Sequence, residues 1–146
     1  MSQSVEQCTD PCRKPRLSLR ERASVVTIVN VRKRRLHKIR VDGCLFEASD
    51  PEKRCDFLIN VADLSRSIIV ELKGSDLDAA LEQLAESHRL LDEFRHSKVT
   101  WIVSCQSTPK TTTKTQNELV RKRKAGITIV IRDSPLHFNL ETNKSV

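Results

Sequence analysis

Two apolar stretches, CDFLINV at residues 55–61 and IIVELK at residues 68–73, decide the fold of this chain. Both are rich in β-branched residues and too short for helices, which predicts two strands joined by a tight turn at residues 62–67. Runs that are apolar on both faces are typical of strands in the middle of a sheet. We therefore expect this hairpin to lie at the centre of the fold.

The upstream flank of this hairpin predicts two more strands. Residues 25–31 are dominated by valine and isoleucine, and residues 36–46 carry Ile39 and Val41 at alternate positions. The basic run at residues 32–35 separates them and predicts a turn. Because these early strands are joined by short connections, we expect antiparallel pairing between them.

The downstream flank begins with a predicted amphipathic helix. Ser75, with Asp78 three residues later, is typical of a helix start, and Gly74 ends the preceding strand. Leucines then recur at helical spacing to about residue 94, with acidic residues on the opposite side. This pattern predicts one apolar helix face that packs on the sheet.

The rest of the chain predicts strand, helix and strand at residues 98–105, 116–124 and 127–131. A strand that follows a crossover helix returns parallel to the strand before it, so we expect 98–105 to lie parallel to 68–73 in one sheet. The predicted fold class is therefore α/β, with a mixed central β-sheet flanked by helices.

The chain length of 146 residues indicates one domain, which we place at residues 19–133. Residues 1–18 contain Pro11 and Pro15, a small basic cluster and no visible period, which predicts a flexible basic N-terminal arm. Residues 134–146 predict a polar C-terminal tail.

The net charge of +7 favours a polyanionic partner such as nucleic acid. Two segments concentrate the positive charge, and a solvated basic face is the competing interpretation of both. The first supplies the predicted nucleic-acid contacts Arg34, Arg35, His37, Lys38 and Arg40. The second is the run at residues 121–124. Aromatic residues are few, which argues against base stacking on single strands.

The cysteines predict a reducing, cytoplasmic setting. There are five of them, and no secretory signal is visible at the N-terminus. We expect Cys44 and Cys55 to be packed thiols. Cys8 and Cys12 lack a second pair with the spacing of a zinc site. No apolar stretch is long enough to cross a bilayer, so we expect no membrane partner.

Three charged residues of the central hairpin form the candidate site. Asp56 begins one strand, and Glu71 and Lys73 end the next, on one face because side chains alternate along a strand. Two adjacent carboxylates are costly without a cation, and Mg²⁺ commonly uses one or two carboxylates. Leu72 points to the opposite face, and its carbonyl offers another oxygen. The competing interpretation is an exposed ion pair at a strand edge.

Asp56, fourteen further residues and then Glu71-Leu72-Lys73 resemble the PD-(D/E)xK nuclease superfamily over residues 23–132. The resemblance implies a restriction-endonuclease-like core and Mg²⁺- or Mn²⁺-dependent hydrolysis of phosphodiesters, with DNA favoured and a homodimer common. Asp56 and Glu71 would bind the metal, and Lys73 would assist water attack. The chain departs from the pattern at Cys55, where a proline often stands, and no helix is evident before the first strand.

Further residues are candidates for supporting roles. The resemblance gives Gln83 a role in positioning water or phosphate, and Ser75 with the helix N-terminus is a candidate phosphate contact. Ordinary boundary and capping roles compete with these interpretations. His88 lies on the apolar stripe, which favours a buried histidine over a catalytic one. The overall alternatives are a metal-dependent DNA endonuclease, or a catalytically inactive nuclease-like domain that binds nucleic acid or a partner protein.

Overall fold

The computed structural model describes residues 4–21, 23–47, 54–72, 76–106 and 111–146. Within these residues the helices and strands are, in chain order, β1 (Thr9–Cys12), β2 (Arg16–Glu21), β3 (Ser24–Val29), β4 (Leu36–Arg40), β5 (Phe57–Val61), β6 (Arg66–Glu71), α1 (Leu77–Leu90), β7 (Lys98–Cys105), α2 (Thr113–Lys124), β8 (Thr128–Asp133), β9 (Leu136–Asn139) and β10 (Lys144–Ser145). A short 3₁₀ turn at Ala62–Leu64 joins β5 to β6.

The central sheet has six strands in the order β1-β4-β5-β6-β7-β8. The pairs β4–β5 and β5–β6 are antiparallel, and β7 lies parallel to β6 after the α1 crossover. The predicted hairpin and the predicted parallel strand at 98–105 are therefore confirmed. The expected antiparallel pairing of the two upstream strands is wrong, because β3 pairs with β2 and β9 in another sheet, whereas β4 pairs with β1 and β5. The central position of β5 and β6 follows from their sequences, because both are apolar on both faces.

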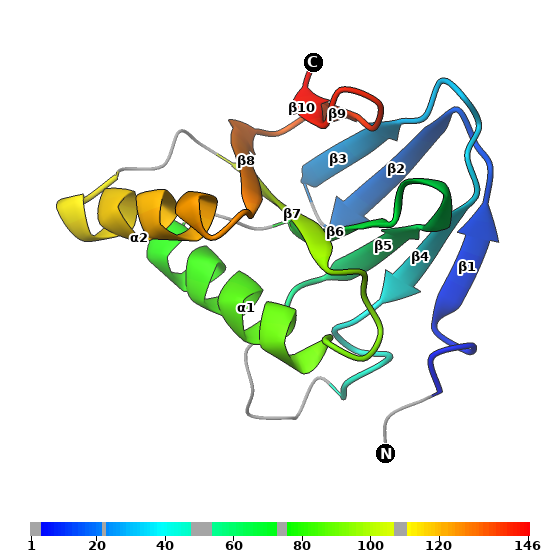
Figure 1. Ribbon diagram of the computed structural model, residues 1–146, viewed down its shortest axis with the longest axis horizontal. Helices are drawn as coiled ribbons and strands as arrows, with labels where there is room; N and C mark the ends of the chain where they lie inside the picture. The colour runs from blue at the N-terminus through cyan, green and yellow to red at the C-terminus, as the bar shows by residue number, and fades with distance from the viewer. Residues whose placement is uncertain (1–3, 22, 48–53, 73–75, 107–110) are drawn as a thin grey trace.

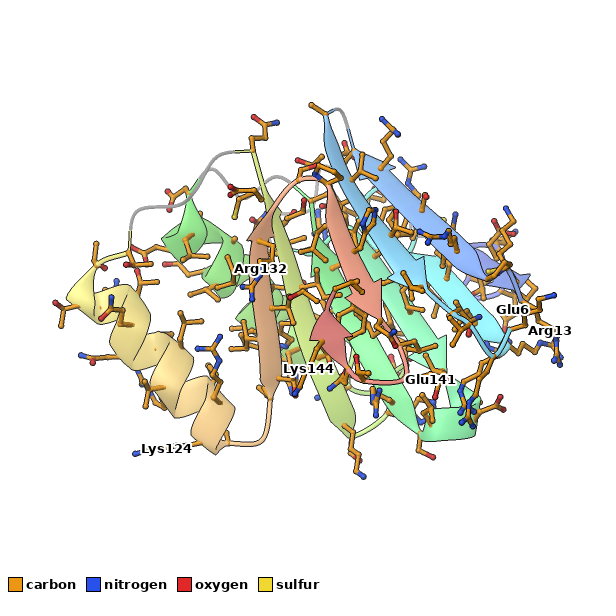
Figure 2. All side chains as sticks on the ribbon, turned by 90° about the horizontal axis from the view of Figure 1, so that it is seen from above. Glu6, Arg13, Lys124, Arg132, Glu141 and Lys144 are labelled. Carbon is orange, nitrogen blue, oxygen red and sulfur yellow. A yellow bond between two sulfur atoms is a disulfide. The ribbon has the colours of Figure 1, made fainter. Side chains whose placement is uncertain are left out.

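The described helices cover one face of this sheet. Helices α1 and α2 lie side by side on that face in Figure 1, and β2, β3, β9 and β10 form a second sheet against the opposite face. Figure 2 looks onto this four-stranded sheet. The mixed central sheet with helices against it is confirmed, and the second sheet, which the sequence did not predict, packs against the other face. None of the described helices has the length and apolar character to span a bilayer.

Two apolar cores hold the three layers together. The core between the helices and the central sheet contains Leu58, Ile69 and Trp101. The core between the two sheets contains Ile68, Val70 and other residues from both layers. Successive β6 residues enter opposite cores because side chains alternate along the strand.

The two chain ends belong to these layers. The prediction of a flexible arm is wrong where the structure describes residues 4–18, since β1 pairs with β4 and β2 pairs with β3. Leu17 and Leu19 are buried between the sheets. The predicted polar tail contains β9, whose Leu136 and Phe138 are buried in the same core. The predicted boundary at residue 19 therefore falls inside β2, and the one at residue 134 separates β9 from its partner β3.

Local boundaries also differ from the predictions. The predicted strand at 36–46 ends at Arg40, since residues 41–46 turn around Gly43, whose φ of 82° favours glycine. Helix α1 is capped by Asp76, whose side chain accepts a hydrogen bond from the Ala79 amide at 3.1 Å, and it ends at Leu90. The predicted cap Ser75 lies outside the described residues.

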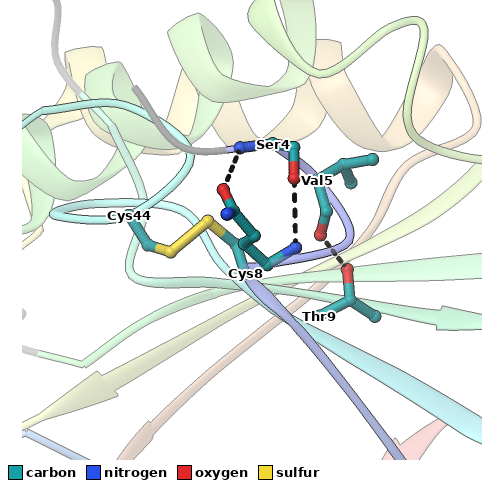
Figure 3. Close-up of a disulfide and its surroundings, with 6 residues drawn as sticks. Ser4, Val5, Cys8, Thr9 and Cys44 are labelled. Atoms are coloured by element: carbon teal, nitrogen blue, oxygen red, sulfur yellow. Dashed lines mark hydrogen bonds between the residues drawn. A yellow bond between two sulfur atoms is a disulfide. The ribbon is translucent and has the colours of Figure 1, made fainter. Parts of the chain in front are cut away.

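Cys8 and Cys44 form a disulfide, drawn in Figure 3. Pairing of β1 with β4 brings Cys8 beside Arg40, whose amide donates to the Cys8 carbonyl, and the turn that follows β4 carries Cys44 back to it. The prediction that Cys44 is a packed free thiol is therefore wrong, and an odd cysteine count did not exclude a disulfide. Cys12, Cys55 and Cys105 are free thiols, and Cys55 is buried as predicted.

The burial of Phe138 predicts that the C-terminal segment carries a large share of the stability. Replacing Phe138 with alanine removes a fully buried ring from the core between the sheets. We expect the free energy of unfolding, measured by urea denaturation, to fall by about 3–5 kcal/mol. The adjacent exposed His137 is the matched control, and His137→Ala should change it by less than about 0.5 kcal/mol. Equal effects of both changes would contradict the burial of β9.

Candidate active site

The hairpin of β5 and β6 sets Asp56 opposite Glu71. Phe57 pairs with Val70, and the Asp56 amide donates to the Val70 carbonyl at 3.0 Å. The Asp56 carbonyl accepts from the Val41 amide on the other side, also at 3.0 Å. The Asp56 backbone is therefore held between two neighbouring segments, which restricts the direction of its side chain.

Both carboxylates converge on one backbone amide. The Leu72 N–H lies 2.8 Å from Asp56 Oδ2 and 3.2 Å from Glu71 Oε1, and both oxygens accept from it. Asp56 and Glu71 each lie two residues from a helix-side core residue of the same strand, Leu58 and Ile69. The two carboxylates therefore face the same point on the helix side of the sheet, as the sequence predicts.

The surroundings of this pair are nearly closed to solvent. Asp56 is 7% exposed and Glu71 is 1% exposed. The Leu72 side chain is fully buried in the core between the sheets, so it does point to the opposite face as predicted. Burial raises the pKa of the Cys55 thiol well above its usual range, and the nearby charges of Glu71 and Asp56 raise it further. Cys55 is therefore an inert neutral neighbour of the carboxylates.

Helix α1 is tied to this end of the sheet through Ser87. Its hydroxyl accepts a hydrogen bond from the Cys55 amide at 2.6 Å, next to Asp56 in the chain. Gln83 precedes Ser87 by four residues and so lies on the same helix face, where it is half-buried. The structure thus brings Gln83 onto the sheet-facing side of α1. Ser87 has a positional role that the analysis of single motifs did not identify.

Arg54 is a second residue that the sequence analysis missed. Its side chain is 3% exposed, and it donates to the Glu47 carbonyl at 2.7 Å and to Asp42 at 3.5 Å. It precedes Asp56 by two residues, and its guanidinium lies 5.8 Å from the centre of the Phe46 ring. The signal that the sequence offers is the spacing of Arg54 and Asp56, which lie two residues apart beside an apolar run. The hydrogen bonds of Arg54 hold the turn that follows β4 against the strand that carries Asp56.

Lys73 and Ser75, two of the predicted site residues, lie outside the described residues. The oxygen donors that remain are the carboxylates of Asp56 and Glu71. No group of three or more histidine, cysteine or acidic residues suited to a metal occurs in the described part of the chain. Magnesium is nevertheless commonly bound by one or two carboxylates, with water and substrate phosphate as further ligands. Two buried carboxylates that face one point fit that requirement.

The predicted nucleic-acid contacts do not form one surface. Arg34 makes a two-pronged ion pair with Glu141, at 2.7 and 3.1 Å, and lies 3.8 Å from Asp63. This places Arg34 at the end of the hairpin opposite to Asp56. The Arg34 guanidinium is thus engaged within the chain, and its contact with nucleic acid stays a prediction.

The other predicted contacts are divided between the two faces of β4. Lys38 and Arg40 alternate with Ile39, which packs under the helices, so they point away from the carboxylates. Lys38 lies 3.8 Å from the Asp10 carboxylate and 5.8 Å from the centre of the Phe57 ring. His37 faces the helix side, and Arg35 is exposed beyond the strand. Of these residues, Arg40 lies at the Asp56 end, where it pairs with Phe57.

His88 has a structural role, although it is half-buried rather than buried as the sequence predicts. Its Nδ1 accepts a hydrogen bond from Trp101 Nε1 at 3.3 Å, and the two rings meet edge to face. Desolvation by burial lowers the pKa of His88 to about 4, and the charges of Arg95 and Lys122 lower it further. The ring is therefore neutral at pH 7, and its Nδ1 is free of a proton and can accept the hydrogen bond from the indole N–H.

Comparison of the chain with protein-family models, with curated proteins and with solved structures gave no match.

The low pKa of His88 predicts a pH-dependent loss of stability. The unfolded chain binds a proton at His88 below about pH 6.5, whereas the folded chain does so only near pH 4. The free energy of unfolding should therefore fall as the pH drops from 7 towards 4. The comparison is His88→Gln, whose side-chain amide can still accept a hydrogen bond from Trp101. Urea denaturation at pH 7, 6 and 5 should show that its free energy of unfolding falls less steeply with decreasing pH than that of the wild type. Parallel curves for the two proteins would contradict the pKa assignment.

Proposed function

We propose that this protein is a divalent-metal-dependent nuclease that hydrolyses phosphodiester bonds of DNA. The observation that carries the proposal is the convergence of the Asp56 and Glu71 carboxylates on the Leu72 amide. Carboxylates buried side by side repel each other, and a shared cation is the usual remedy in a site that handles phosphate. The net charge of +7 supports a polyanionic substrate.

The order of the elements supports the same proposal. The resemblance to the PD-(D/E)xK superfamily implies an acid on one strand, the E-x-K motif on the next, a helix and then a parallel strand. Here the antiparallel pair β5–β6 is followed by α1 and by β7, which is parallel to β6. A restriction-endonuclease-like core is therefore part of the proposal, with the second sheet added on the face that helices do not cover.

Each residue of the proposed centre has a stated task. Asp56 and Glu71 would hold Mg²⁺ or Mn²⁺, with the Leu72 carbonyl as a further oxygen donor. When bound, such an ion supplies Lewis-acid stabilisation of the negative charge on the phosphoryl oxygens. Lys73 would orient the attacking water and balance developing negative charge. Gln83 would position water or phosphate from the sheet-facing side of α1.

A catalytically inactive domain that binds nucleic acid or a partner protein is the second candidate. The observation in its favour is the near-complete burial of Asp56 and Glu71, each of which accepts a hydrogen bond from Leu72. Carboxylates that accept hydrogen bonds from a backbone amide can have a purely structural role, which is to close the end of a strand. The two candidates differ in whether the carboxylates bind a metal ion.

Cleavage of DNA should require both carboxylates. We expect wild-type protein with Mg²⁺ or Mn²⁺ to cut a panel of single-stranded, duplex and branched DNA, and chelation to stop it. Asp56→Asn and Glu71→Gln should each slow cleavage at least about a hundredfold, since a metal contributes several kcal/mol to the transition state. Glu93→Gln, which removes an exposed carboxylate, should leave the rate unchanged. Full activity in Asp56→Asn would discard the proposed centre.

Metal binding separates the two candidates without a cleavage assay. The wild-type protein should be stabilised by Mg²⁺ or Mn²⁺, by about 2.7 kcal/mol at a metal concentration one hundred times the dissociation constant. Asp56→Asn should lose this stabilisation, and Glu93→Gln should keep it. Thermal denaturation with and without metal measures the difference. If none of the proteins responds to metal, the inactive binding domain is the better description.

A further inference from the structure

The four-stranded sheet has one buried face and one outer face. Leu17, Leu19, Val26 and Ile28 point inward to the core between the sheets, so the residues between them point outward. The outward positions of the described strands are Arg16, Ser18, Arg20, Val25, Thr27, Val29, His137, Asn139 and Lys144. None of these positions carries a carboxylate, and none carries phenylalanine, tryptophan or tyrosine.

The strand register fixes the positions of the cations on this face. Lys144 pairs with Asn139, Asn139 with Val29, and Val29 with Arg16, so one straight row crosses all four strands. Lys144 and Arg16 stand at its two ends, three strand spacings or about 14 Å apart. Arg20 lies four residues along β2 from Arg16, again about 14 Å away. The three cations thus mark the corners of one area of the outer face, and all three are exposed.

A fourth cation extends this area beside β9 and β10. Arg132 follows Val130 by two residues on β8, and Val130 packs into the core between the sheets, so both point to the same side. Figure 2 shows Arg132 and Lys144 on the face that the four-stranded sheet presents. We call Arg16, Arg20, Arg132 and Lys144 the outer basic face.

We propose that the outer basic face binds the phosphate backbone of duplex DNA. Flexible cations on a flat sheet neutralise phosphates without reading the bases. The row from Arg16 to Lys144 spans a distance comparable to the major groove of B-form DNA, which is about 12 Å wide. The deep, narrow major groove of A-form RNA does not match that spacing.

The composition of the face supports a duplex over other anionic partners. A surface that binds single strands uses aromatic rings for stacking, and the outward positions hold none. A surface that enters membranes uses large apolar side chains beside its cations. At the rim, the Glu141 carboxylate is engaged by Arg34, so much of its negative charge is balanced within the chain.

This binding surface is separate from the proposed catalytic centre, although both assume DNA as the partner. The carboxylates lie on the helix side of the central sheet, and the outer basic face lies beyond the other side. The two come nearest at one end of the molecule. Ser134 accepts from the Val25 amide, next to Arg20 in register, and donates to the Cys105 carbonyl at the end of β7. Because β7 is parallel to β6, that end of β7 lies near Glu71.

The test is a binding measurement that does not need catalysis. Full-length protein in EDTA is titrated against a fluorescent 20-base-pair DNA duplex at several salt concentrations. The face variant Arg16→Ser/Arg20→Ser/Lys144→Ser is compared with Lys114→Ser/Arg121→Ser/Lys124→Ser, which removes three exposed positive charges from α2. The face variant should reduce the slope of log affinity against log salt by about 2.7, the contribution of three phosphate contacts.

The control variant should change that slope by less than half as much. Equal slopes for the two variants would overturn the proposal, since net charge alone would then account for binding. A face variant that binds like wild type would also overturn it. Circular dichroism confirms folding, and Arg16→Lys/Arg20→Lys should bind like wild type.

Two further probes test the choice of partner. An RNA duplex of the same sequence should bind at least several-fold more weakly than the DNA duplex. Vesicles of phosphatidylcholine with one-third phosphatidylserine should not distinguish the face variant from the control. Tighter binding to the RNA duplex than to the DNA duplex would identify RNA as the partner instead. If the face variant loses binding to vesicles but not to DNA, an anionic membrane would be the partner instead. Because EDTA is present throughout, these results are independent of whether the carboxylates support cleavage.

Discussion

Strand β6 is covered on both of its faces, and this constraint governs where a charged group can lie. Residues 67–72 are all buried, with Ile69 under the helices and Ile68 and Val70 against the second sheet. A carboxylate in such a strand is costly unless polar partners satisfy it. Glu71 lies at the strand end, where its Oε1 shares the Leu72 amide with Asp56. The chemistry of the site is therefore confined to the end of the hairpin.

The central hairpin and the strand after α1 could be predicted because their signals are local. β-Branched runs define β5, β6 and β7, and one crossover determines the parallel pairing. The opposition of Asp56 and Glu71 follows from the same short turn. The helix start was harder to place, since both Ser75 and Asp76 are good capping residues. Only the structure shows that the Asp76 side chain reaches the Ala79 amide.

The second sheet could not be predicted, because its partners are far apart in the sequence. Leu17 and Leu19 alternate with exposed residues, as do Leu136 and Phe138, but each pattern is too short to identify a strand by itself. Their burial depends on β3, which pairs with β2 on one side and with β9 on the other. The same reasoning applies to the pairing of Cys8 with Cys44, which needs β1 beside β4.

Replacing a helical layer with a sheet changes what the molecule presents to a polyanion. A helix exposes a narrow, strongly curved surface, whereas a sheet, here with both parallel and antiparallel pairs, exposes a broader twisted face with side chains about 5 and 7 Å apart. Arg16 and Lys144 lie on such a surface, and the core between the sheets and the central sheet itself separate them from the buried pair of Asp56 and Glu71. Carboxylates repel phosphates, so cations on a separate surface would supply affinity at a distance from that repulsion. If both proposals hold, the second sheet separates the surface that attracts DNA from the place where the DNA backbone reacts.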